Sequence, residues 1–212
     1  MHCLRGRGER LSPDIDYYGY TPLITPDQPL ALVGLPAAHV GGTARLVSSF
    51  TGLPLFWMDR AVEHRAGASI DAIVLEKGDQ VRREHERALL PRVLDAPTPH
   101  VMVLSEVTLA DPELGPALRS RTTVFALRRH LDEVIATIAA AHEKRPPAYA
   151  RLLLGRKPDP AALAEELQRL AAHHQDVDHE LDVTGMHPQH AAQAVIDALG
   201  WKLPVIWERP KD

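Results

Sequence analysis

The sequence predicts an α/β protein built around a parallel β-sheet. Two observations lead to this prediction. Short apolar runs typical of buried strands recur along the chain, and longer stretches with helical spacing separate one run from the next. Such alternation is typical of βαβ units, in which helices cover both faces of the sheet. We therefore expect one domain with a three-layer α/β/α fold around a five-stranded parallel sheet.

Five apolar runs supply the expected strands. In chain order they are LALVG at 30–34, LPLFW at 53–57, HVMVLS at 100–105, TTVFAL at 122–127 and HELDV at 179–183. Ahead of them, residues 1–27 are rich in Arg, Gly, Pro and Tyr and show no sustained period, so we expect an N-terminal extension there. The domain itself is expected to span residues 28–200, with residues 201–212 as a C-terminal tail.

Three of the intervening stretches carry clear helical signals. Asp159 and Pro160 form a favourable N-cap and first-turn pair, and the leucines that follow recur at helical spacing. The apolar stripes are Leu163, Leu167 and Leu170; Leu131, Val134, Ile135 and Ile138; and Ala191, Val195 and Leu199, the last with Pro188 near its start. Between the first two lies a Pro-rich and basic segment, which predicts a mobile, lid-like loop at residues 144–158.

Composition excludes several classes of protein. No apolar run approaches a membrane-spanning length, and the basic N-terminus is not followed by the apolar core of a secretory signal, so we expect a cytoplasmic protein. With Cys3 as the only cysteine, neither an intramolecular disulfide nor a cysteine-based zinc site can form. A formal net charge of −4, without a basic block, argues against nucleic-acid binding.

The segment GLPAAHVGGT, at residues 34–43, lies between the first expected strand and a helix-like stretch. A Gly-rich turn at that place directs backbone N–H groups and a helix dipole at an anion. The P-loop pattern asks for Gly, four residues, Gly, Lys and then Ser or Thr. Here Gly34 is followed by His39, Val40 and Gly41 at the last three positions, so three of the four anchors are absent.

The rest of the chain carries a broader resemblance, from about residue 30 to residue 199. The segments that carry it are LVGLP, ARLVSSFTGLPLFWMDRAVEHRAGASI, EKGDQVRREHERALLPRVL and LDVTGMHPQHAAQAVIDAL. In order and spacing they resemble the shikimate kinases, whose patterns include IGLPGSGKSTVGRLLA, GLPFVDTDRAIE and GEXXFRXXE. That family has a P-loop kinase-like fold. Its members are transferases of aromatic amino acid biosynthesis that use ATP and magnesium to phosphorylate a hydroxyl of shikimate.

On the acceptor side, the resemblance carries the family's substrate-binding residues over to charged positions. The second aspartate of the family's D-T-D falls on Asp59, its substrate arginines on Arg83 and Arg169, and its lid arginine on Arg145. Glu86 falls on the family's glutamate, where we expect it to orient Arg83. Two guanidinium groups that converge on a carboxylate offer it planar forks of donors. The alternative is that these residues form ordinary surface ion pairs.

On the phosphate side, the resemblance carries over little of the family's chemistry. The family's lysine falls on Val40, its magnesium-ligating serine on Gly41 and the first aspartate of D-T-D on Trp57. Its G-G-G falls on residues 105–107, where Glu106 would repel a phosphoryl group. Phosphoryl transfer depends on positioning and charge stabilisation. Each missing group would therefore cost about 3–4 kcal/mol of transition-state stabilisation, and together these losses would remove most of the rate enhancement.

We therefore expect a catalytically reduced relative of shikimate kinase, a pseudokinase with a degenerate phosphate loop, no metal site and no cofactor. It would bind a shikimate-like anion or act through protein contacts. One alternative is an active small-molecule kinase that uses ATP and magnesium and in which Arg45 or Arg145 replaces the lysine. Another is a structural or regulatory partner in an assembly. The stretch HHQDVDHE, at residues 173–180, contains metal-binding residue types without the spacing of a zinc site.

Overall fold

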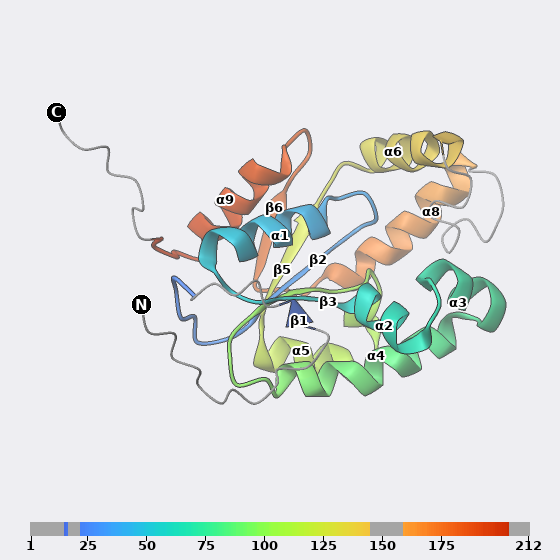
Figure 1. The fold of residues 1–212 in the computed structure, drawn as a ribbon. Helices are drawn as coiled ribbons and strands as arrows, with labels where there is room; N and C mark the ends of the chain where they lie inside the picture. The colour runs from blue at the N-terminus through green and yellow to red at the C-terminus, as the bar shows by residue number, and fades with distance from the viewer. Residues whose placement is uncertain (1–14, 17–21, 145–158, 204–212) are drawn as a thin grey trace.

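The computed structural model describes residues 15–16, 22–144 and 159–203 and shows a twisted sheet between layers of helices (Figure 1). The sheet has six strands in the order β1-β3-β4-β2-β5-β6. Their bounds are β1 Ile15–Asp16, β2 Leu30–Gly34, β3 Leu55–Trp57, β4 Val101–Val103, β5 Thr123–Arg128 and β6 His179–Asp182. Strands β2 to β6 run parallel, which confirms the predicted five-stranded parallel sheet.

The sixth strand was not predicted. β1 pairs antiparallel with β3 at the edge of the sheet, with Ile15 opposite Phe56 and Asp16 opposite Leu55. These two residues belong to the segment expected to be an extension without regular structure. A pair of residues is too short to produce an apolar period, so the sequence pattern carries no signal for it.

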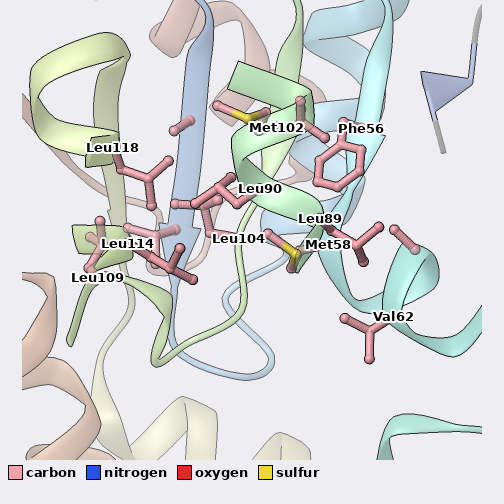
Figure 2. Packing of buried hydrophobic residues seen from close by; sticks show 14 of the residues in the cluster. Phe56, Met58, Val62, Leu89, Leu90, Met102, Leu104, Leu109, Leu114 and Leu118 are labelled. Atoms are coloured by element: carbon pink, nitrogen blue, oxygen red, sulfur yellow. The ribbon is translucent and has the colours of Figure 1, made fainter. Parts of the chain in front are cut away.

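Helices cover both faces of the sheet. They are α1 Val40–Thr51, α2 Met58–Ala66, α3 Ile70–Lys77, α4 Asp79–Leu94, α5 Leu114–Arg121, α6 Leu131–Lys144, α8 Pro160–Ala171 and α9 Pro188–Ala198, with short 3-10 turns η1 Thr108–Ala110 and η2 Ala172–His174. On one face, α1 and α9 pack together through residues such as Val47 and Val195. On the other face, α2 to α5 enclose a second core that contains Phe56 and Met102 (Figure 2).

The helical signals in the sequence correspond to observed helices. The Asp159 side chain caps α8 by accepting from the Ala161 N–H at 3.2 Å, and Leu163, Leu167 and Leu170 are buried. The helices α6 and α8 pack together at one end of the sheet, where they form a third apolar cluster with Leu35. Within the described ranges, no helix is both long and apolar enough to span a bilayer.

Candidate functional site

A cavity lies at the carboxyl ends of β2, β3 and β4, where parallel strands deliver their following loops. Its volume is about 310 Å³, and its lining runs from the loop after β2 to the segment after β4. The lining includes four of the predicted loop positions, Gly34, His39, Val40 and Gly41, together with Trp57, Asp59 and Glu106. The charged groups of this lining are therefore two carboxylates.

The loop between β2 and α1 has an unusual backbone. Ala37 and His39 have φ angles of 65° and 57°, in the left-handed region. The Ala38 N–H donates to the Leu35 carbonyl at 3.0 Å, and His39 stands at the N-cap of α1. The chain thus makes a tight turn into the helix, as a phosphate-binding loop does, with residues other than glycine at the two left-handed positions.

Trp57 and Gly41 are in direct contact across the cavity. A Cβ atom added to Gly41 would lie 2.3 Å from Cζ2 and Cη2 of the Trp57 indole. Arg60 stacks on the same indole with its Cζ 4.5 Å from the ring centroid, and the Cζ of Arg45 lies 5.9 Å away. The tryptophan side chain therefore fills the space beside the start of α1, and only glycine fits opposite it.

Arg129, which was not predicted, reaches the loop from the end of β5. Its Nη1 donates to the Ala37 carbonyl at 2.6 Å and lies 3.3 Å from His39 Nε2. Burial, the positive charge of Arg129 and nearby His187 lower the pKa of His39. A cation from the end of β5 therefore contacts the loop.

A buried polar network lies behind the cavity. Arg82, 4% exposed, donates to Glu86, 1% exposed, and to Ser105 Oγ at 3.0 Å. Ser105 Oγ in turn donates to Glu86 at 2.8 Å. Burial raises the pKa of Glu86 to about 7, and the nearby carboxylates of Asp59 and Glu106 add to the shift against the opposing effect of Arg82.

This network corrects one expectation. Glu86 was expected to orient Arg83, but in the structure it pairs with Arg82. The two arginines are neighbours on α4, so about 100° of helix separates their directions. Only Arg82 is directed into the protein at that level of the helix. Arg82 lies four residues and Arg83 three residues before Glu86, and both spacings allow an ion pair on a helix, so spacing alone could not identify the pair.

The two predicted substrate arginines lie on α4 and α8. Arg83 Nε donates to Asp79 Oδ2 at 2.7 Å, and Arg169 Nε donates to Glu166 Oε2 at 2.8 Å. Burial and the positive charges of both arginines lower the pKa of His173. Both guanidinium groups are partly exposed and can exchange an internal carboxylate for a ligand's carboxylate.

The remaining candidates from the sequence are the lid arginine and the stretch with metal-binding residue types. Arg145 lies outside the described residues. In the stretch at 173–180, His174 contacts the Glu106 carbonyl at 2.7 Å and Asp178 accepts from the Val124 N–H at 2.7 Å. The His179 ring stacks on Phe125. These side chains are directed to separate neighbours, and the described residues contain no group of three or more potential metal ligands.

Comparison with known proteins identifies the family and the fold of this chain. A family model for shikimate kinase matches residues 42–200, well over half of the chain. Shikimate kinases from two strains of Caulobacter vibrioides are 29% identical over 138 residues, which cover 65% of this chain and 64% of the relative. The match thus spans just under two thirds of the length of these relatives.

Solved structures show the same fold at low sequence identity. Shikimate kinase from Bacteroides thetaiotaomicron superposes with a TM-score of 0.69 at 15% identity, covering 82% of this chain and 98% of its own. Shikimate kinase from Acinetobacter baumannii, solved in complex with shikimate, has a TM-score of 0.69 at 18% identity and covers 84% of this chain and 97% of its own. The fold is that of the P-loop kinases, and the chain belongs to the shikimate kinase family.

Proposed function

We propose that this chain is a member of the shikimate kinase family that binds a shikimate-like anion and does not transfer a phosphoryl group from ATP. The observation that carries the proposal is the contact between Gly41 and Trp57. The family's pattern has a serine and an aspartate at these two positions, both oxygen ligands for magnesium. Here one side chain is absent and the other is an indole that occupies the space.

The residues of the loop cavity do not fit a magnesium-bound triphosphate. Magnesium requires oxygen ligands in near-octahedral geometry, and bound phosphates require positive charge close by. Val40 supplies no charge at the lysine position, while Asp59 and Glu106 line the same cavity. Glu106 adds a carboxylate where the family's pattern has glycine, and negative charge near a triphosphate raises its energy, so the site disfavours the family's cofactor.

The acceptor side retains suitable chemistry for a small hydroxylated acid. Arg83 and Arg169 offer guanidinium donors to a carboxylate, and Asp59, in the first turn of α2, offers an acceptor for hydroxyl groups. We propose that Glu86, being almost fully buried, supports this side through Arg82 and Ser105 rather than through contact with the ligand.

Thermal-shift measurements with separate ligands test the proposal. We expect shikimate alone to raise the melting temperature and ATP with magnesium to leave it unchanged. Arg83→Ala should abolish the shikimate shift, whereas Arg92→Ala, an exposed arginine on the same helix, should retain it. A shikimate shift that persists in Arg83→Ala would show that Arg83 is not part of the site. No change in melting temperature with either ligand would favour a role through protein contacts.

A second candidate function, an active kinase, is favoured by one observation. The guanidinium of Arg129 contacts the loop at Ala37 and His39, so positive charge is present near the phosphate-binding turn without the lysine. An arginine there can neutralise an oxyanion. A dose-dependent stabilisation by ATP with magnesium, together with phosphorylation of shikimate, would establish this alternative and refute the first proposal.

A further inference from the structure

The loop after β2 has positive φ angles, which glycine favours, at residues that are not glycine. The family's pattern GLPGSGKST has glycine where this chain has Ala37 and His39, and both residues adopt positive φ angles. For residues with a Cβ atom, the left-handed conformation costs roughly 1–2 kcal/mol each. Such conformations persist only when surrounding contacts hold them, so the structure must contain a compensating interaction.

Arg129 supplies that interaction. Its side chain is only 14% exposed and makes contacts on two sides. Nη1 donates to the Ala37 carbonyl at 2.6 Å and lies 3.3 Å from His39 Nε2, while Nε donates to Glu133 at 2.9 Å. Glu133, in the first turn of α6, also accepts from the Gly185 N–H at 3.4 Å. Arg129 thus ties both left-handed residues to α6 and to the turn before α9.

The same contact defines the hydrogen-bonding state of His39. A guanidinium group has donors and no acceptor, so His39 Nε2 must accept from Arg129, and the ring proton must be on Nδ1. The charged and titratable groups that face this ring are Arg129, from the end of β5, and His187, from the N-cap of α9, with Glu133 behind the guanidinium. Burial, the positive charge of Arg129 and the nearby His187 lower the pKa of His39 and so disfavour a second proton on the imidazole.

We propose that Arg129 is a positioning residue of the loop cavity: it holds residues 37–39 in the left-handed turn and fixes His39 as an uncharged Nδ1–H donor in the cavity wall. The inference stands independently of whether the chain transfers phosphate. A neutral donor at this wall recognises a hydrogen-bond acceptor, such as a hydroxyl or carbonyl oxygen. It does not require the several negative charges of a triphosphate.

Arg129→Met tests the proposal, because methionine retains much of the apolar stem and removes every donor. Arg128→Met is the matched control. Arg128 is the preceding residue and also makes guanidinium contacts, to Glu180 at 2.6 Å and to the His174 carbonyl at 2.9 Å, away from the loop. Amide hydrogen exchange of residues 37–41 measures how firmly the loop is held, and the ring ¹⁵N shifts of His39 report its tautomer and its titration.

We expect Arg129→Met to speed amide exchange in residues 37–41 by about tenfold or more, the effect of losing one charge-assisted hydrogen bond. The pKa of His39 should rise toward its ordinary value, and Arg128→Met should change neither measurement. Exchange and His39 titration that stay as in the wild type would overturn the proposal. The wild-type tautomer needs no variant, so a proton found on Nε2 would overturn it even where Arg129→Met fails to fold.

Discussion

Adding a methyl group at Gly41 tests the contact on which the proposed function rests. In Gly41→Ala, the new Cβ would lie 2.3 Å from two atoms of the Trp57 indole, so the ring must move. Overpacking of this kind costs about 1–3 kcal/mol. Replacing glycine with alanine in a helix stabilises the helix by about 1 kcal/mol. We therefore expect Gly41→Ala to change stability by roughly 0–2 kcal/mol in the unfavourable direction.

A double-mutant cycle separates the clash from the helix effect. In a Trp57→Ala background the indole is absent, so Gly41→Ala should become stabilising by about 1 kcal/mol. The coupling between the two positions should then equal the clash, about 1–3 kcal/mol, measured by urea unfolding followed by circular dichroism. Effects that add within about 0.5 kcal/mol would show that Trp57 does not occupy the space beside Gly41 in solution.

Two further predictions concern stability. The folded pKa of Glu86, about 7, lies above its ordinary 4.5, so its stabilising contribution is present below about pH 4.5 and is lost as the pH rises to about 7. Glu86→Gln should flatten the dependence of the unfolding free energy on pH between about pH 4.5 and pH 7, by on the order of 3 kcal/mol over that range. A slope as steep as that of the wild type would contradict the prediction. Asp159→Ala removes the cap of α8 and should cost about 1 kcal/mol in urea unfolding, whereas Asp159→Asn, which still caps, should cost much less.

Most of the sheet could be predicted because strands β2 to β5 are largely buried at successive positions, whereas β6 is only partly covered. Segments such as those around Leu32 and Phe125 are apolar at successive positions, and each run in the sequence became a strand. The α8 helix followed from a local signal, the Asp159 cap with its leucine stripe. β1 could not be predicted, since its two residues gain their structure from pairing with β3 rather than from their own pattern.

The site was less predictable because its important contacts are long-range. The sequence indicated which loop positions lack the family's residues, and the cavity does contain Val40, Gly41 and Trp57. Nothing local connects Arg129 to Ala37, which is 92 positions away in the chain. Likewise, residue spacing alone could not decide which of two adjacent arginines on α4 is directed inward, because that depends on how the helix packs.

Calorimetric titration of the wild-type protein with ATP and magnesium shows whether the loop cavity binds the nucleotide. The Val40→Lys, Gly41→Ser, Trp57→Asp triple variant serves as the comparison, because it restores the charge and both oxygen ligands at the positions that the family's pattern defines. We expect no binding heat for the wild type and measurable binding for the triple variant. Micromolar binding of ATP and magnesium by the wild type would contradict this expectation.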